Sequence, residues 1–274
     1  RLPGTAKSLL AQSSVPAMAN QFMYYSDFLY DTSDITSQPL GNLSTAYWGS
    51  GTGMLATRSA WANNATYINM ICGPYTESHA HHDQGSFVLF KGNWLAYDSN
   101  IASQSGIAQS EGMHNLVRVE QNGSVVTQRE GSAPCQLQAM ADNANYTYGM
   151  AHVTPVYDGK PQVVKVEREF LFLKPGTLVL LDRVQTSGAG ISRVWGINLP
   201  AAPVFIGDNL RLTQGSNWLD IIRLAPSGLT TQVRSWPTLD PDVHTGVRAD
   251  VADSVGNTSV FLHVLSTDGA TTAA

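Results

Sequence analysis

The feature that most constrains the fold of this chain is a series of short, β-prone segments that begins at Tyr47. The segments are rich in β-branched and aromatic residues, and several alternate apolar with polar positions. They are 53–61, 65–72, 85–90, 93–98, 115–120, 163–173, 177–184, 191–199, 218–224 and 259–266. Turn signals such as Lys91-Gly92-Asn93 and Gln121-Asn122-Gly123 separate them. Many strands without intervening helices predict a mainly β protein, built as one large antiparallel β-sandwich.

The first 45 residues have a different pattern. Apolar residues from Met18 to Leu29 recur at helical spacing, with Ser14 as a cap and Pro16 in the first turn. A polar, turn-rich stretch follows this segment. We therefore predict a short helix over residues 15–30 and a linker up to residue 45, with the β-sandwich domain over residues 46–274.

Composition limits the class of protein. Charged residues make up 14% and hydrophobic residues 43% of the chain, which is typical of a globular protein. The net charge of -5 argues against nucleic acid as a partner, and no apolar run is long enough to span a membrane. Cys72 and Cys135 could form one bridge or stay as small buried hydrophobic residues. Few charges, many small polar residues and six Trp fit an exported carbohydrate-active protein.

A cluster of histidines indicates a metal site. Three of the seven histidines lie between positions 79 and 82, and Asp83 follows them. On a strand, His79, His81 and Asp83 would share one face, and His82 would point away as a bystander. A tight hairpin at Gly92 would return Asp98 to the histidine end of the ladder, and His114 opens a later strand. Two imidazoles and a carboxylate suit zinc, so we predict His81, Asp98 and His114 as its ligands. The alternative is that they are ordinary polar residues at strand ends.

Four stretches of the sequence resemble the C-terminal β-domain of the heparinase II/III-like polysaccharide lyases. They are "YWGSGTGMLATRSAWANNATYINMICGP", "SHAHHDQGSFVLFKGNWLAYDSN", "MHNLVRV" and "REFLFLKPGTLVLLDRV", and the resemblance covers roughly residues 45 to 265. In that family a toroid of α-helices packs against the β-sandwich, and the active site lies between them. The resemblance implies a lyase that cleaves a uronic-acid-containing acidic polysaccharide by β-elimination, in the periplasm or secreted.

The resemblance also implies roles for single residues. His79 matches the motif histidine that faces substrate and is the predicted catalytic residue. His81, Asp98 and His114 match the positions that hold zinc. Tyr75, Gln84 and Asn115 flank the site and are predicted substrate contacts. The family's toroid supplies a catalytic tyrosine, so we expect residues 1–45 to come from a preceding helical domain, with the toroid in the same or another chain.

Two other classes of protein remain as alternatives. Gly73, His79 and His81 form a G-x5-H-x-H pattern that resembles the first motif of cupin metal enzymes, but Gly85 and Ser86 stand where that motif places glutamate. The chain could also be a carbohydrate-binding or structural module without catalytic activity.

Arginines could bind the acidic groups of a polysaccharide. Arg118, Arg168, Arg183 and Arg193 are the candidates. Arg168 and Arg183 stand beside acidic residues, which favours surface ion pairs for both of them.

Overall fold

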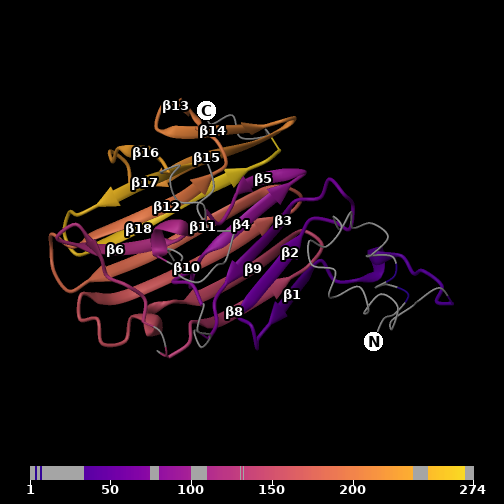
Figure 1. Cartoon of the computed structure of the whole chain (residues 1–274), viewed down its shortest axis with the longest axis horizontal. Helices are drawn as coiled ribbons and strands as arrows, with labels where there is room; N and C mark the ends of the chain where they lie inside the picture. The colour runs from indigo at the N-terminus through magenta and orange to yellow at the C-terminus, as the bar shows by residue number, and fades with distance from the viewer. Residues whose placement is uncertain are drawn as a thin grey trace, which may run out of the picture. The chain divides into compact units, whose positions relative to one another are not determined.

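Strands form most of the described chain, and within residues 46–268, outside the undescribed stretches, they make three antiparallel sheets (Figure 1). The structure is a computed structural model that describes residues 4, 7, 34–74, 80–99, 110–129, 131, 133–236 and 246–268. The chain divides into two compact units, Arg1–Thr45 and Ala46–Ala274. The helix predicted over residues 15–30 lies outside the described residues. The described helical segments are short 3-10 turns: η2 (Leu40–Asn42), η3 (Glu111–Met113) and η4 (Thr154–Tyr157).

The three sheets differ in how their strands follow the chain. Sheet A is a meander with the order β1 (Ala46–Gly49), β2 (Met54–Arg58), β3 (Tyr67–Ile71), β4 (Phe87–Lys91) and β5 (Asn93–Ala96). Sheet B has the order β16 (Thr231–Ser235), β17 (Val247–Asp253), β12 (Ser192–Leu199), β6 (Val117–Gln121) and β7 (Ser124–Val125). Sheet C has the order β13 (Val204–Ile206), β14 (Asn209–Gln214), β15 (Asn217–Ala225), β18 (Thr258–Ser266), β11 (Thr177–Thr186), β10 (Val163–Leu173), β9 (Tyr146–His152) and β8 (Gln136–Asp142).

Sheets A and B adjoin each other, and both pack on sheet C. The N–H of Tyr97, just after β5, donates to the carbonyl of Asn198 on β12 at 3.2 Å. Over sheet C, Trp195 of β12 stacks on His263 of β18 with ring centroids 3.7 Å apart. On β9, a Cβ added at Gly149 would lie 2.9 Å from Cδ2 of Leu55 on β2, so glycine permits close packing there. The mainly β, antiparallel sandwich fold predicted from the sequence is confirmed.

The core lies between these layers and follows the alternation of the strands. On β10 and β11 every second residue is buried, including Phe170, Phe172, Leu178 and Leu180. Each such side chain contributes about 2 kcal/mol by leaving water. Residues of all three sheets belong to this one hydrophobic cluster.

The two cysteines form a disulfide bridge between the layers. Cys72 follows β3 of sheet A, and Cys135 precedes β8 of sheet C. Of the two alternatives that the sequence leaves open, the bridge is the one present. Among the described residues, no helix has the length and apolar character needed to cross a membrane.

Asn115 joins sheets A and B from within the protein. Its Nδ2 donates to the carbonyls of Phe87 at 2.7 Å and Tyr97 at 3.2 Å. Its Oδ1 accepts the N–H of Asn198 at 2.6 Å. The side chain is 1% exposed, so no water can replace these bonds cheaply. Asn115 is therefore a structural link in addition to any role as the substrate contact that the sequence predicts.

We expect Asn115→Ala to lower the free energy of unfolding by roughly 2–5 kcal/mol, because it leaves buried backbone groups of both sheets without partners. Asn63→Ala is the matched control, since Asn63 is exposed and should change stability by less than about 0.5 kcal/mol. Urea unfolding of both variants measures the difference. Equal stability of the two variants would contradict the structural role.

Candidate metal site

The three predicted metal ligands lie together at one end of sheet A. Ligand atoms of His81, Asp98 and His114 all lie within 4.8 Å of one another. The hairpin at Gly92, with φ of +66°, reverses the chain between β4 and β5 and so returns Asp98 to this end. His114 directly follows η3 and precedes β6. The hairpin geometry expected from the sequence is confirmed.

The segment before β4 is not the strand that the sequence predicts. Residues 80–86 are irregular, and β4 begins only at Phe87. The N–H of Ser86 donates to the carbonyl of Asp83 at 2.8 Å, in a turn around Gly85 with φ of +88°. The N–H of Gly85 and the carbonyl of Ser86 bond to the backbone of Ile71, at the end of β3, at 2.8 and 3.0 Å. The predicted strand over residues 79–83 is therefore wrong for the part that is described. His79 and Tyr75, the predicted catalytic and substrate residues, lie outside the described residues.

His114 is the buried member of the triad. It is 2% exposed, and its Nδ1 lies 3.1 Å from Oδ2 of Asp98. Burial alone would lower the pKa of His114, but the hydrogen bond and the charge of Asp98 outweigh it, so the pKa is raised. Its other nitrogen, Nε2, is buried and has no hydrogen-bond partner among the described residues. Such an orphaned imidazole nitrogen is suited to bind a metal, with the carboxylate fixing the ring.

His81 and Asp83 complete the surroundings of the triad. Burial lowers the pKa of His81, and repulsion by His114 lowers it further. Burial raises the pKa of Asp83, while the charge of His114 opposes that rise. The rings of His81 and His114 have centroids 5.2 Å apart. A neutral His81 is the form that donates a lone pair to a metal.

Two cavities meet this site. One, of about 130 Å³, is lined by Asp83, Asp98, His114 and Asn115 among others. The second, of about 320 Å³, is lined by His81, Asp83 and Gln84 with residues of the β1–β2 and β3 ends. Asp83 lines both cavities.

A buried hydrogen-bond network fixes the segments that carry the histidines. Gln84 accepts the N–H of Gly73 at 2.7 Å and donates to Asp83 Oδ1 at 3.1 Å. Its backbone exchanges two bonds with the side chain of Gln128, both at 3.0 Å. The N–H of Gln128 in turn donates to Oε1 of Glu111 at 2.6 Å. Gln84, predicted to contact substrate, is 4% exposed and makes these internal bonds.

His82 is not a member of the triad, and its bystander role stays a prediction. Its Nδ1 is 3.7 Å from Oε2 of Glu111. Among the described histidines outside the cluster, His152 pairs with Glu167 and His263 is buried under Trp195.

Arg168 is a buried anchor for the site. It lies opposite Asp182 in the β10–β11 register and forms a two-point ion pair with it, Nε–Oδ1 2.6 Å and Nη2–Oδ2 3.0 Å. Its Nη1 donates to the carbonyls of Gly85 at 2.7 Å and Asn115 at 2.8 Å. Both side chains of the pair are 1% exposed, so the surface pairing predicted for Arg168 is wrong. The sequence could not predict the burial of Arg168, because acidic neighbours in the sequence do not indicate whether a strand residue faces the core.

The other candidate arginines are also engaged within the protein. Arg183 pairs with Glu169 on the surface, as predicted. Arg193 is fully buried and donates to three backbone carbonyls. Arg118 is 3% exposed and pairs with Glu120 and Asp250.

The donor set at this site is two imidazoles and one carboxylate, a combination that fits zinc with a fourth position left open. The buried, unpartnered Nε2 of His114 supports this fit. The described residues alone can therefore hold a divalent ion between the hairpin and the segment that leads into β6.

Comparisons with known proteins relate this architecture to polysaccharide lyases. No family model matches the chain, and no curated protein matches its sequence. The solved structure of the heparan sulfate lyase HepC from Pedobacter heparinus matches with a TM-score of 0.68 at 18% identity. That match covers 98% of this chain and 42% of the lyase. Two heparinase III structures match with TM-scores of 0.68 and 0.66 at 15% identity.

These likenesses establish the fold of the chain. It is the β-sandwich found in heparinase-type lyases, as the sequence resemblance predicts. The two heparinase III matches cover 88% and 85% of this chain but 38% and 37% of those proteins. The chain thus corresponds to about two fifths of the length of these lyases.

We expect Arg168→Met to lower the free energy of unfolding by about 3–5 kcal/mol, because Asp182 is left buried without a counter-charge. The double variant Arg168→Met/Asp182→Leu removes both charges and should recover much of this stability. It still leaves the carbonyls of Gly85 and Asn115 unbound, so zinc affinity should remain about 10–100-fold weaker than in the unchanged chain.

Denaturant unfolding and zinc titration of the same samples separate the two effects. Arg193→Met is the matched control, because it removes a buried arginine that is bonded elsewhere in the sandwich. It should destabilise the protein without weakening zinc binding in the folded state. Full zinc affinity in the double variant would show that Arg168 does not position the site.

Proposed function

We propose that this chain is the β-sandwich part of a polysaccharide lyase that cleaves a uronic-acid-containing acidic polysaccharide by β-elimination. The observation that carries the proposal is the His81–Asp98–His114 triad beside a cavity, on a sandwich whose fold matches heparan sulfate lyases. A fold alone would not justify an activity, because one fold hosts many functions. The site chemistry supplies the additional support.

The reaction needs three operations. The proton on C5 of a uronic acid is α to a carboxylate and is too weakly acidic to leave unaided. Neutralising that carboxylate stabilises the enolate that develops as the proton leaves. A base then removes the proton, an acid protonates the departing 4-oxygen, and a double bond forms between C4 and C5.

Within this proposal His79 removes the C5 proton or holds the uronate carboxylate. It is two residues from His81 in the sequence, and a catalytic group needs such a fixed neighbour to be positioned precisely. Tyr75, Gln84 and Asn115 are proposed to border the bound sugar. The proposed sugar contacts of Gln84 and Asn115 are supported by the cavities that these two residues line.

Zinc is the proposed metal, held by His81, Asp98 and His114. When bound, the ion would supply a fixed positive charge and cross-link the hairpin to the segment that leads into β6. Proton removal from C5 does not require a metal-activated water, in contrast to hydrolysis. The ligand residues are therefore proposed to act mainly by stiffening the cavity wall that His81, Asp98 and His114 line.

The proposed partners are an acidic polysaccharide and a helical toroid in the same or another chain. The short coverage of the matched lyases supports a partner of this kind. A periplasmic or secreted location is proposed as well. The Cys72–Cys135 bridge supports it, because disulfides persist in oxidising compartments.

We expect the chain with its helical partner to raise ultraviolet absorbance from the C4–C5 double bond when it is given heparan sulfate or another polyuronate. The chain alone should show little activity, because the acid–base tyrosine is expected from the toroid. His79→Ala should lower turnover by about 10²–10⁴-fold while zinc stays bound. His152→Ala, in sheet C, is the matched control and should retain full turnover.

Two results would oppose the proposed function. Binding of polysaccharide without any absorbance change, with the partner present, would identify a carbohydrate-binding module instead. Robust activity of the isolated chain would contradict the need for a partner and direct attention to Tyr75 and Tyr97.

We expect elemental analysis to find about one zinc per chain. His81→Ala and His114→Ala should lose it, because each removes one of three protein ligands. His82→Ala should keep it, since His82 faces Glu111. Chelation should lower the melting temperature of the unchanged chain and leave that of His114→Ala unaltered. Zinc retention by both ligand variants would exclude this site.

A further inference from the structure

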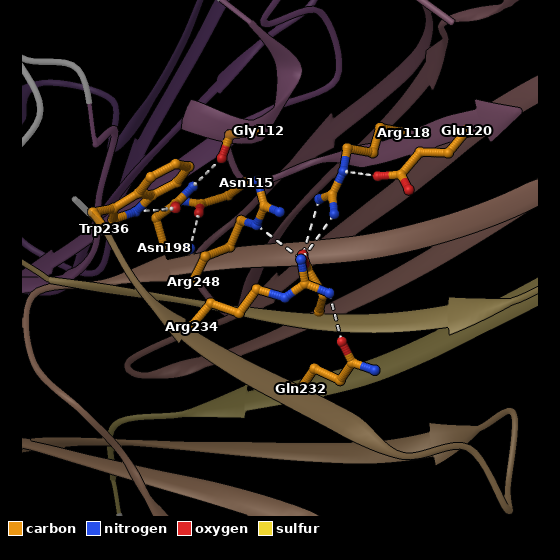
Figure 2. Close-up of polar contacts among 10 residues, drawn as sticks. Gly112, Asn115, Arg118, Glu120, Asn198, Gln232, Arg234, Trp236 and Arg248 are labelled. Atoms are coloured by element: carbon orange, nitrogen blue, oxygen red, sulfur yellow. Dashed lines mark hydrogen bonds and ion pairs between the residues drawn. The ribbon is translucent and has the colours of Figure 1, made fainter. Parts of the chain in front are cut away.

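The outer face of sheet B carries three arginines on neighbouring strands. Alternate residues of β6, β17 and β16 pack into or against the core, which leaves Arg118, Arg248 and Arg234 on the outer face. Figure 2 shows the three arginine side chains pointing toward one another, and Arg248 also lies over the ring of Trp236. We call these three residues the guanidinium patch.

Arg118 is neutralised within the patch. It crosses β12 at Gly196, where an added Cβ would lie 2.8 Å from its Nη1. It reaches both oxygens of Asp250, at 2.9 and 2.8 Å, and Oε1 of Glu120 at 2.7 Å. Arg118 thus neutralises much of the charge of Asp250 and Glu120.

Arg248 and Arg234 have less compensation. Arg248 donates from Nε to Asp250 at 2.9 Å, an acid that Arg118 already shares. Within the described chain, the terminal nitrogens of Arg248 have no acceptor and Arg234 has no acidic partner. Among the described residues, Arg234 bonds through its side chain to the neutral Gln232, at 2.6 Å. Burial lowers the pKa of Arg248, and repulsion by Arg118 adds to this, as expected for a cation short of counter-charge.

The register places the two arginines against each other. Arg234 on β16 lies directly opposite Arg248 on β17. Like charges in such cross-strand pairs are destabilising, and an anion bound between them would reverse that cost. Two guanidinium groups with free N–H donors match the oxygens of a carboxylate or a sulfate.

Arg248 is held in place for such contact. Its guanidinium lies over the ring of Trp236, 5.1 Å from the centroid, and an added Cβ at Gly112 would collide with its Nη1. The indole Nε1 of Trp236 donates to Asn198 at 3.0 Å, which fixes the ring. A pre-positioned guanidinium loses little entropy on binding.

The patch is connected to the candidate metal site through a short segment. Asn198 donates to the carbonyl of Gly112 at 3.3 Å and to the side chain of Asn115 at 2.6 Å. His114 lies between these two residues. The patch and the triad are therefore both connected to the same segment, residues 111–115.

We propose that Arg234 and Arg248 bind an anionic group, a carboxylate or a sulfate, on a sugar residue beyond the one bound at the metal site. The identity of this ligand as an acidic polysaccharide rests on the proposed function. Arg118 and Trp236 act as positioning residues, because they set the charge and orientation of Arg248. The patch thus supplies a second subsite that selects acidic over neutral polymers.

The test is direct binding by calorimetry of the full chain with three size-matched oligosaccharides: sulfated heparan sulfate, unsulfated heparosan and a neutral glucan. We expect Arg234→Gln/Arg248→Gln to weaken binding of an acidic oligosaccharide about tenfold or more and to leave neutral binding unchanged. Loss confined to the sulfated probe assigns the ligand as sulfate, and equal loss for both acidic probes assigns it as carboxylate. Lysine at both positions should restore part of the affinity.

Arg211→Gln is the matched control, since Arg211 pairs with Asp220 on sheet C and should not affect binding. If the double variant does not fold, the single variant Arg234→Gln, at an exposed side chain, carries the test. Acidic affinity within twofold of the unchanged chain, or no binding of acidic probes by that chain, overturns the inference. Selective loss of acidic binding, with no lyase activity even when the helical partner is present, would uphold the subsite and reject the proposed function.

Discussion

The buried guanidinium of Arg168 is the interaction on which the candidate site depends. Its charge is balanced by Asp182 within sheet C, and this frees Nη1 to hold the carbonyls of Gly85 and Asn115. Those two carbonyls belong to the segments that carry His81 and His114. Removing either partner of a buried pair costs several kcal/mol, so the site is anchored to a pair that the sandwich itself depends on. A histidine cluster on irregular backbone can be rigid for this reason.

The sequence predicts the fold where the core pattern is carried by the strand itself. β10 and β11 alternate visibly because Phe170, Phe172, Leu178 and Leu180 face the core. The sequence does not predict β9, because its buried residues, Thr147, Gly149 and Ala151, are small or polar. Leu55 of the facing sheet fills the space above Gly149. The sequence does not predict β8 either, because nearly all of its residues are exposed and no apolar alternation results. A strand that packs against apolar side chains of another sheet can have little apolar alternation in its own sequence.

The site was predictable to a similar extent. A hairpin turn and two strand ends suffice to bring His81, Asp98 and His114 together, and turn chemistry is local in sequence. The irregular course of residues 80–86 was not predictable, because the bonds of Gln84 to Gly73 and Gln128 form only in the packed structure. The inward position of Arg168 and the link made by Asn115 are likewise tertiary. Local patterns therefore identify the candidate ligands, whereas the supports that hold these residues require the packed structure.

The passage of Arg118 over Gly196 restricts how this face of the protein can change in evolution. A side chain at position 196 would collide with the guanidinium and with Asp250, which lies 3.0 Å from the added Cβ. Changes at the two positions are therefore non-additive, and their order matters. If a larger residue appears at position 196 first, the intermediate protein is strained. If Arg118 is replaced first, Asp250 keeps Arg248 as its ion-pair partner. The second route allows larger residues at position 196, but Asp250 then neutralises Arg248 more fully.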